Sequence, residues 1–342
     1  MATLGGLLIK KSWFSFGFSF CLRYLCRPMK TIYFPDESIC DGGYVATVGF
    51  FDGVHRGHQY LLECLQKEAL QQGLPSMVIT FERHPRQVVQ QQWKSELLTT
   101  LEEKIALIRQ TGIDVLVVLR FNQQMATLSA YDFMDSVLHQ SLGVRCLLTG
   151  YDNRFGYNRA ESFEDYCRYG RQLGMKVMDS NAFVVGTSNA SSSRIRQLLK
   201  AGNVEEARQC LGRPYALSGR VVHGEQVGRK IGFPTANLQP DVKDQLVPGN
   251  GVYAVMVCVE GGCQKHGIMN IGTRPTFNGE KRTLETNILD EVGDIYGKKL
   301  RIEFIRRLRD ERPFASGEAL SEQIKRDKTQ AEHILKDYEQ ES

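Results

Sequence analysis

Short apolar runs alternate with amphipathic segments from about residue 44 to residue 212. Each run has five or six residues and predicts a buried strand; the runs lie at 45–50, 77–81, 115–119 and 144–148. Between them, apolar side chains at helical spacing or a capping box at Thr100-Leu101-Glu102-Glu103 predict helices at 58–72, from 101 and at 130–140. Strands that alternate with helices favour an α/β fold with a doubly wound parallel sheet.

The pattern changes after Arg213-Pro214, where short strands follow one another with Gly and Pro turns between them. These strands are predicted at 217–222, 252–259, 267–271, 283–289 and 300–306. Repeated short strands separated by turns are typical of a small β-barrel or sandwich. The last segment, 318–338, is polar with helical periodicity and predicts a C-terminal helix.

Composition places the chain among globular proteins of about two domains. It has 342 residues, of which 42% are hydrophobic and 24% charged, and this excludes a wholly disordered or fibrous protein. The net charge of +4, with one basic run at 301–312, is too small to indicate a nucleic-acid partner. The nine cysteines include no CxxC pair, so no zinc-site pattern is present, and scattered thiols suit a cytoplasmic protein.

The first 28 residues differ from the rest. Lys10-Lys11 precedes an apolar run, 13–22, that is about half the length of a membrane span and ends at Arg23. A signal peptide is one interpretation, but no small-residue cleavage site follows. We therefore interpret residues 1–28 as a disordered leader or a mis-assigned start, with Met29 as the true start, and expect no membrane partner.

A glycine-rich turn joins the first strong strand to the first strong helix and reads Gly49-Phe50-Phe51-Asp52-Gly53-Val54-His55-Arg56-Gly57-His58. Its glycines let the backbone approach a phosphate, and the helix that begins near Gly57 directs free N–H groups at that anion. His55 and His58 can both face one ligand and donate hydrogen bonds to phosphate oxygens. The alternative is a plain turn with two surface histidines.

A second glycine-rich motif lies in the strand-rich half and reads Gly224-Glu225-Gln226-Val227-Gly228-Arg229-Lys230-Ile231-Gly232-Phe233-Pro234-Thr235-Ala236-Asn237. The hydroxyl of Thr235 and the amide oxygen of Asn237 are hard ligands suited to Mg²⁺. The motif therefore predicts a phosphate and metal site, and a hairpin without a ligand is the alternative.

These motifs resemble known families. The segment GFFDGVHRGH is similar to the HxGH nucleotidyltransferases, and more closely to the FAD synthetase module of bacterial bifunctional riboflavin kinase/FAD synthetases. Three further segments follow that module in order: Thr80-Phe81-Glu82-Arg83-His84-Pro85, Gly150-Tyr151-Asp152-Asn153-Arg154-Phe155-Gly156 and Ser191-Ser192-Ser193-Arg194-Ile195-Arg196. The second motif resembles the signature of riboflavin kinases, with later matches at 270–277, 283–290, 296–297 and 309–314.

The first resemblance implies adenylyl transfer, in which the FMN phosphate attacks the α-phosphorus of ATP and pyrophosphate leaves. Ser191 to Ser193 would cap a helix, and Arg196 would bind the pyrophosphate. The implied ATP-binding residues are Gly49, Phe50, Asp52, Gly53, His55, Gly57, His58, Ser192, Ser193 and Arg196, with His55 and His58 catalytic. The implied FMN-binding residues are Asp152, Asn153 and Arg159.

The second resemblance implies a β-barrel that phosphorylates riboflavin. Glu285 occupies the position of the catalytic base, which would take the proton of the riboflavin 5′-hydroxyl as that oxygen attacks the γ-phosphorus of ATP. Glu285 and Arg309 would lie on the flavin side. The implied ATP-binding residues are Gly224, Gly228, Arg229, Gly232, Thr235 and Asn237, with Thr235 and Asn237 as ligands of Mg²⁺.

We therefore predict an adenylyltransferase domain at 29–202, a linker at 203–212 and a riboflavin kinase domain at 213–342. The substrates would be ATP, riboflavin and FMN, with Mg²⁺ in both steps and FAD as the final product. The sequence is also compatible with a weak homo-oligomer.

The chain departs from the family at Asn153, Ser162 and Asn287, where the family usually has an aromatic residue, Gly and His. Two alternatives stay open: an enzyme with one surviving activity, and a flavin- or nucleotide-binding sensor without catalysis. Retention of both histidines with Glu285 argues against the sensor, because a binding protein needs no base.

Overall fold

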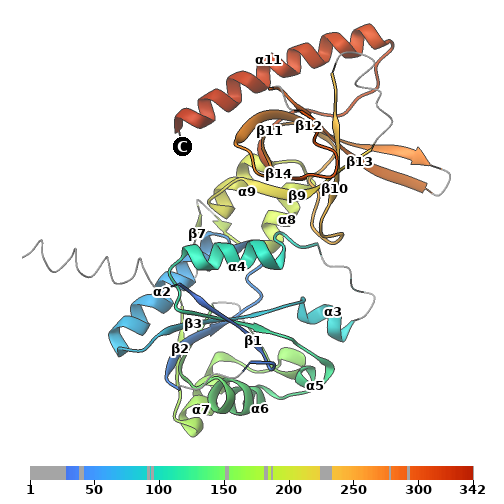
Figure 1. The fold of residues 1–342 in the computed structure, drawn as a ribbon. Coiled ribbons are helices and arrows are strands. Elements are labelled where there is room, and N and C mark those ends of the chain that lie inside the picture. Colours follow the sequence, from blue (N-terminus) through green and yellow to red (C-terminus); the bar gives the residue numbers. More distant parts are fainter. Residues whose placement is uncertain are drawn as a thin grey trace, which may run out of the picture. The chain divides into compact units, whose positions relative to one another are not determined.

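The computed structural model describes residues 28–37, 42–90, 93, 96–150, 154–180, 184–185, 188–223, 233–276, 279–290 and 293–341 (Figure 1). The chain divides into two compact units. The sheet unit comprises Met1–Phe50, Gln59–Gln91 and Leu101–Asn181. The barrel unit comprises Phe51–His58, Gln92–Thr100 and Ala182–Ser342.

The sheet unit is built on six parallel strands in the order β1-β4-β3-β2-β5-β6. They are β1 (Lys30–Phe34), β2 (Tyr44–Val48), β3 (Ser76–Phe81), β4 (Val115–Leu119), β5 (Val144–Thr149) and β6 (Lys176–Asp179). Every residue of β3 and β4 is buried, as expected for parallel strands covered on both faces. From β2 the chain adds β3 on one side and β5 on the other, so the strand order reverses beside β2.

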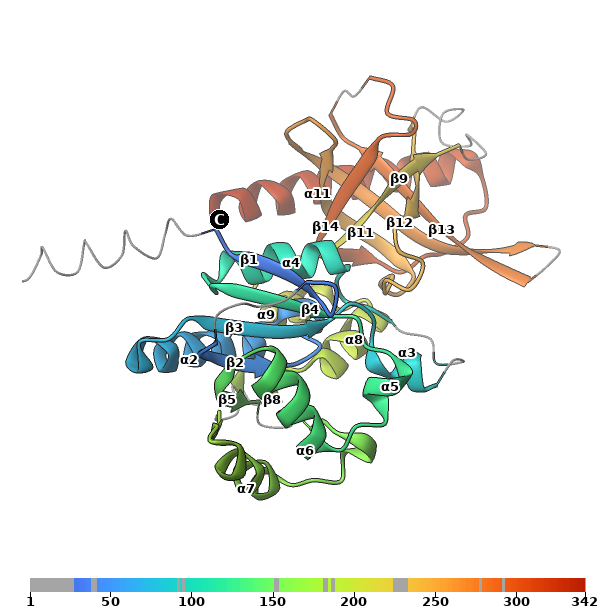
Figure 2. The same cartoon turned by 60° about the horizontal axis from the view of Figure 1, so that its bottom comes forward.

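Helices connect these strands and cover both faces of the sheet, with α4 on one face and α6 and α7 on the other (Figures 1 and 2). They are α2 (Arg56–Gln72), α3 (Pro85–Val89), α4 (Leu101–Gln110), α5 (Gln123–Ala126), α6 (Ala130–Asp132), a π-helix (Phe133–Ser141), a 3-10 turn (Tyr157–Arg159) and α7 (Phe163–Leu173). The single helix predicted at 130–140 is therefore α6 continued by a π-helix. Ser162, one of the departures from the family, caps α7 in a reciprocal capping box with Asp165.

The barrel unit contains six antiparallel strands that close in the order β10-β13-β12-β11-β14-β9. They are β9 (Tyr215–Val222), β10 (Ala236–Pro240), β11 (Gly251–Val259), β12 (Gln264–Thr276), β13 (Gly279–Ile288) and β14 (Lys299–Arg309). The C-terminal helix α11 (Gly317–Glu341) packs Ala331 and Leu335 against Ala254 and Ile268 on the outside of the barrel.

Two further helices share the hydrophobic core of the barrel. They are α8 (Ser192–Lys200) and α9 (Val204–Leu211), which follow the short strands β7 (Val184–Val185) and β8 (Ser188–Asn189). Leu199 of α8 and Leu211 of α9 belong to one core cluster with Tyr215 and Phe304 of the strands. The segment predicted as a linker, 203–212, is thus mainly the packed helix α9.

The predicted fold class is confirmed: a parallel sheet with helices precedes a closed six-stranded barrel with a C-terminal helix. The sequence pattern did not identify β1, β6 or β10, which are only four or five residues long and mix polar with apolar residues. In the described part of the chain, no helix combines the length and apolar character needed to cross a membrane.

We expect Leu199→Ala to lower the free energy of unfolding by about 2–5 kcal/mol, the usual cost of a cavity in a packed core. Leu199 is fully buried in the cluster that joins α8 to the barrel. Urea denaturation measures the change, with Leu70→Ala as the control because Leu70 is 46% exposed. Equal losses in the two variants would contradict this account of the core.

Candidate active sites

The segment that follows β2 forms a strained turn before α2. Phe51, Gly53 and Val54 have φ angles of 53°, 80° and 37°. This left-handed region is unfavourable for residues with side chains, and most of all for a β-branched residue such as valine. Strain of this kind persists only where surrounding contacts fix it. The turn also follows a strand beside which the sheet order reverses, where open α/β sheets bind ligands.

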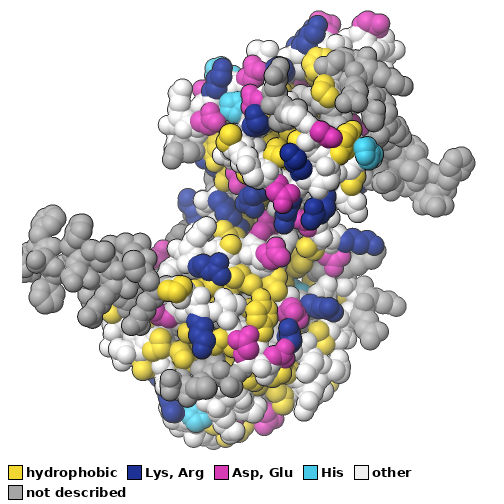
Figure 3. Space-filling model, viewed as in Figure 1, with side chains coloured by type: hydrophobic (Ala, Val, Ile, Leu, Met, Phe, Trp, Pro, Cys, Tyr) yellow, Lys and Arg dark blue, Asp and Glu magenta, His cyan; other side chains and the backbone are white. Residues whose placement is uncertain are grey.

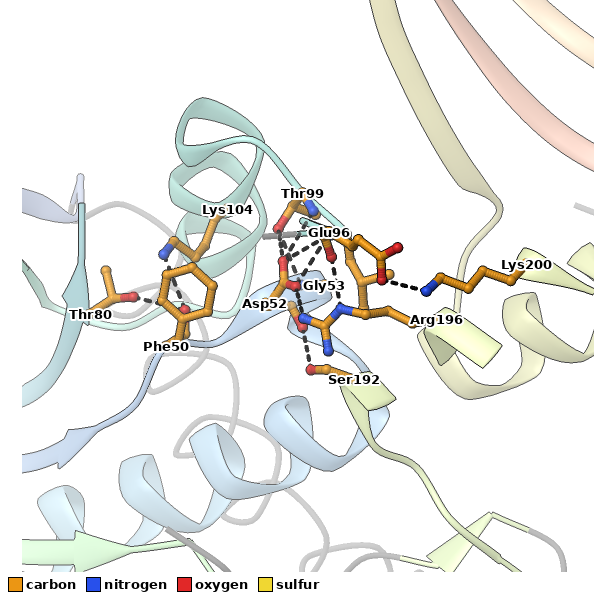
Figure 4. A network of polar contacts seen from close by, with 11 residues as sticks. Phe50, Asp52, Gly53, Thr80, Glu96, Thr99, Lys104, Ser192, Arg196 and Lys200 are labelled. Atoms are coloured by element: carbon orange, nitrogen blue, oxygen red, sulfur yellow. Dashed lines mark hydrogen bonds and ion pairs between the residues drawn. The ribbon is translucent and has the colours of Figure 1, made fainter. Parts of the chain in front are cut away.

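The buried carboxylate of Asp52 fixes the turn (Figure 4). It accepts hydrogen bonds from the backbone N–H groups of Leu98 at 2.9 Å and Thr99 at 3.2 Å. It also forms an ion pair with the guanidinium of Arg196 at 2.5 Å. The hydroxyl of Ser192 donates to the backbone carbonyl of Asp52 at 3.0 Å. Asp52 and Arg196, both predicted to contact ATP, therefore hold the turn against α8.

The space around Gly53 in the same turn is too small for a side chain. Its N–H donates to the Thr99 hydroxyl at 3.1 Å, and its carbonyl accepts a hydrogen bond from Arg213 at 2.8 Å. A Cβ at this position would lie 2.9 Å from a Leu98 methyl carbon. Its positive φ and the adjacent leucine together require glycine here.

His55 and His58 are brought together, as the spacing predicted. Their rings stack with centroids 3.6 Å apart, and the edge of the Phe51 ring packs against His58 at 5.1 Å. The backbone N–H of His58 donates to Nδ1 of His55 at 3.3 Å. Gly57 makes this packing possible, because a Cβ there would approach the Ala190 carbonyl oxygen to 3.0 Å and the His55 ring to 3.2 Å.

His55 is held neutral. Burial, and then the positive charges of Arg213 and Arg196, lower the pKa of His55 from 6.5 to about 4. Its Nδ1 accepts a hydrogen bond, so the ring proton of the neutral imidazole lies on Nε2. At neutral pH, His55 is therefore a hydrogen-bond donor through Nε2 rather than a cation.

The predicted serine cap is present at the start of α8. The Ser191 hydroxyl accepts a hydrogen bond from the N–H of Arg194 at 3.3 Å, and Ser192 and Ser193 are the first two residues of the helix. Their N–H groups lie in the first turn, where α-helices have no internal acceptors. An anion can bind such N–H groups. The hydroxyl of Ser192, in contrast, already donates a hydrogen bond to the backbone carbonyl of Asp52.

The sheet unit contains a pocket of about 380 Å³, within the range of small-molecule sites. It opens at the carboxyl ends of β2, β3 and β4. Its wall includes the residues Gly49, Phe50, Phe81, His84, Phe121, Phe133, Phe155 and Arg159. The Phe50 ring packs edge-on against His84 at 4.6 Å, and Phe155 stacks on Tyr166 at 4.3 Å.

Of the three residues predicted to bind FMN, Arg159 lines this pocket. Asp152 and Asn153 lie outside the described residues. No sequence motif singled out Phe81, Phe121 and Phe155 as an aromatic wall. Each of these residues ends or follows an apolar strand run, and that position could have identified them.

In the barrel, the strand register brings the predicted kinase residues into one row. Asn237 of β10 pairs with Glu285 of β13, which pairs with Asn270 of β12. Asn270 pairs with Val252 of β11, and Val252 pairs with Arg309 of β14. Directly paired residues share a face of a sheet. We call this set the barrel row.

The neighbours of the row show which face it occupies. Val252 belongs to the cluster that α11 covers on the outside of the barrel. Ala236 and Met269, adjacent along their strands to Asn237 and Asn270, belong to the internal core. Because side chains alternate along a strand, the row lies on the outer face.

Arg309 at the end of the row is held by the C-terminal helix. Its Nε and Nη2 donate to the carboxylate of Asp327 at 3.0 and 2.8 Å, and Asp327 is 3% exposed. Gln323 donates to the same carboxylate at 2.8 Å. A bidentate pair of this kind fixes the plane of the guanidinium.

The Asn237 end of the row is held by a different contact. The amide of Asn287 donates to the backbone carbonyl of Pro234 at 2.7 Å, one residue before Thr235. Gly224, Gly228, Arg229 and Gly232 lie outside the described residues. Within the described ranges, no group of three or more His, Cys, Asp or Glu could hold a metal ion.

Several arginines of the basic run at 301–312 form ion pairs with nearby carboxylates. Carboxylates lie within 4 Å of Arg301, Arg306 and Arg307, in addition to Arg309. Figure 3 shows positive and negative side chains interspersed over the visible face of each unit. We therefore interpret the run as a strand surface whose positive charges are balanced by neighbouring carboxylates.

The fold defines a transferase in two parts: a parallel sheet of the nucleotidyltransferase type, and a closed barrel whose outer face carries a row of carboxylate and amide side chains. Residues 38–194 match the FAD synthetase family, and residues 211–335 match the riboflavin kinase family.

The bifunctional riboflavin kinase/FMN adenylyltransferase of Escherichia coli (strain K12) is 40% identical over 86% of this chain and 93% of its own. The enzyme of the same description from Bacillus subtilis (strain 168) is 37% identical over 84% and 91%. A crystal structure described as a macrolide-efflux protein from Streptococcus pneumoniae superposes with a TM-score of 0.80 at 31% identity, over 88% of this chain and 98% of that one. This chain belongs to the bifunctional riboflavin kinase/FMN adenylyltransferase family.

We expect His55 to make stability fall as the pH drops from 6.5 to about 4. In this window the unfolded chain binds a proton at His55 and the folded chain does not, so unfolding is favoured as protons are added. The stability that neutral His55 contributes to the folded state is fully present above pH 6.5 and is lost towards pH 4. Denaturation at several pH values measures it in the wild type and in His55→Asn, whose amide oxygen can still accept from His58.

The difference in unfolding free energy between wild type and His55→Asn should be constant above pH 6.5 and shrink below it. His333→Asn is the control, because the side chain of His333 is 80% exposed on α11. Parallel stability curves for wild type and His55→Asn across the whole window would contradict the neutral, buried state of His55.

Proposed function

We propose that the two reactions of the family are divided between the halves of this chain, with adenylyl transfer at 29–202 and riboflavin phosphorylation at 213–342. The protein is a transferase with both activities. It converts riboflavin and ATP to FMN and ADP, and then FMN and ATP to FAD and pyrophosphate. The paired register of Asn237 and Glu285 is the observation that most strongly supports the kinase assignment.

For the kinase step, we propose Glu285 as the general base. Its carboxylate would accept the proton of the riboflavin 5′-hydroxyl while that oxygen attacks the γ-phosphorus of ATP. The attacking oxygen forms the new P–O bond, and the bond from the γ-phosphorus to the β–γ bridging oxygen breaks to release ADP. Arg309, oriented by Asp327, would contact the flavin end of the substrate.

The residues beside Glu285 fit a magnesium ion bound with ATP. Asn237 lies directly opposite Glu285, and Thr235 precedes the same strand. Hydroxyl and amide oxygens are hard ligands, and Mg²⁺ usually takes few protein ligands beside substrate phosphates. We propose that Thr235 and Asn237 hold this ion, which would neutralise phosphate charge as the reaction proceeds.

For adenylyl transfer, we propose that the turn and the first residues of α8 bind the phosphates of ATP. Neutral His55 and its stacked partner His58 would donate hydrogen bonds to the α-phosphate as an FMN phosphate oxygen attacks it. The α-phosphorus gains one P–O bond and loses the bond to pyrophosphate. Asp52 contributes by positioning the turn, because its carboxylate already accepts hydrogen bonds from Leu98, Thr99 and Arg196.

The pocket of the sheet unit is the proposed site of FMN. A planar isoalloxazine ring suits a wall of aromatic side chains, and the guanidinium of Arg159 suits the phosphate. The six free cysteines of the described residues also support a cytoplasmic location, which we propose with them.

A product assay with riboflavin, ATP and Mg²⁺, followed by chromatography, tests the two-step function. FMN followed by FAD is the expected result. FMN alone would leave the kinase as the single activity, and FAD formed only from added FMN would leave the adenylyltransferase. No product from either flavin would favour a sensor.

We expect His55→Ala and His58→Ala each to lower the rate of FAD formation by about 100-fold or more, since each removes a donor to the reacting phosphate. FMN formation from riboflavin should stay within about twofold of wild type, and it serves as the internal check of folding. His139→Ala, on the π-helix of the sheet unit, is the matched control. Loss of both activities in a folded variant would contradict the two-site assignment.

We expect Glu285→Gln to have the opposite effect. Removal of a general base should slow riboflavin phosphorylation by about 10²–10⁴-fold, while FAD formation from added FMN continues. Asn237→Ala should weaken the same step and make it more dependent on the Mg²⁺ concentration. Glu303→Gln, on β14, is the control because Glu303 lies outside the barrel row. A normal kinase rate in Glu285→Gln would refute its role as base.

A further inference from the structure

A buried lysine lies behind the pocket of the sheet unit. Lys104 of α4 is 3% exposed, although lysine is among the residues least often buried. Its Nζ donates to the backbone carbonyl of Phe50 at 3.1 Å and to that of Phe81 at 3.0 Å. The ammonium also lies 4.3 Å from the centre of the Phe50 ring, within the range of a cation–π contact.

The two carbonyls lie at the ends of adjacent strands. Phe81 is the last residue of β3, and Phe50 follows β2 by two positions. Both residues line the pocket. One ammonium thus ties together the two strand ends that form part of the pocket wall, and Figure 4 shows it reaching the Phe50 backbone from α4.

The Phe50 carbonyl is held by a second donor. The hydroxyl of Thr80 donates to it at 3.1 Å (Figure 4). In a trans peptide the N–H points opposite to the carbonyl, so these two bonds also set the direction of the N–H of Phe51. Phe51 is the first left-handed residue of the strained turn.

The choice of lysine carries a cost that a neutral donor would avoid. Burying a charged group is unfavourable unless its surroundings compensate for the lost hydration. The positive charge instead strengthens the hydrogen bonds to the two strand-end carbonyls, because a charged donor binds a carbonyl oxygen more tightly than a neutral donor does.

We propose that Lys104 is a positioning residue for adenylyl transfer, which fixes the Phe50–Phe51 peptide and the adjoining pocket wall by binding both strand-end carbonyls. This inference rests on the proposed assignment of the turn and the pocket to ATP and FMN. Lys104 acts through Phe50 and Phe81 and does not line the pocket itself.

The test compares Lys104→Met with wild type in the full chain, measuring kcat and KM for FAD formation from FMN and ATP. Methionine keeps the length and apolar stem and removes the charge together with the hydrogen bonds to Phe50 and Phe81. We expect kcat to fall by about 10- to 100-fold, the cost of a displaced reacting geometry. The KM for FMN should change by less than about threefold, and riboflavin phosphorylation on the same polypeptide should be unchanged.

Two further variants make the result decisive. Thr80→Val removes the weaker of the two supports of the Phe50 carbonyl and should lower kcat for FAD formation by about threefold to tenfold. Lys176→Met is the control, because Lys176 is 56% exposed in its ion pair with Glu68 in the same unit. It should leave both activities at wild-type levels.

A lower thermal midpoint of Lys104→Met with normal kcat would overturn the proposal, since it would show a role in stability alone. If the sheet unit of Lys104→Met does not fold, as shown by loss of its thermal unfolding transition, a normal kcat in Thr80→Val overturns the proposal instead. Absence of FAD formation in the wild type would refute the proposed function itself, independently of either variant.

Discussion

The strained turn between β2 and α2 depends on one buried carboxylate. Asp52 lies within a turn whose flanking residues Phe51 and Val54 adopt left-handed backbone angles, at a cost of about 1–3 kcal/mol each. Its carboxylate stabilises these backbone angles by binding the backbone N–H of Leu98 and the guanidinium of Arg196, which come from different parts of the chain. Breaking a buried pair leaves an uncompensated charge and costs about 3–5 kcal/mol, comparable to the strain it opposes. The arrangement of the histidines therefore depends on a residue that need not touch ATP.

Two other buried charged groups in the chain act in the same way. A buried Asp327 holds Arg309 at the end of the barrel row, and a buried Lys104 holds the strand ends beside the pocket. In each case the charged group is satisfied by several directional bonds, so it selects one arrangement of its neighbours. Apolar packing holds the sheet and the barrel together, whereas these charged groups orient the residues proposed to meet substrate.

Local patterns in the sequence were enough to predict much of the fold. The apolar run at 115–119 is β4 to the residue, because a strand buried on both faces needs no polar position. β1 and β10 escaped prediction because their mixed patterns become strands only through pairing, with β4 in one case and with β9 and β13 in the other. The two glycine motifs could also be predicted, because each is a contiguous stretch of sequence. The contact between Asp52 and Arg196 could not be predicted from such local patterns. The two residues lie 144 positions apart in the sequence, and only the fold brings them together.

The departure at Asn287 shows how a changed residue can keep the geometry of a site. Asn287 lies two positions beyond Glu285 on β13, so both side chains share the outer face of the barrel. Its amide donates to the Pro234 carbonyl, as the N–H of an imidazole could do. Pro234 directly precedes Thr235 and the strand that carries Asn237. The substitution thus keeps a donor on the segment proposed to bind ATP, and it gives no reason to regard the kinase site as decayed.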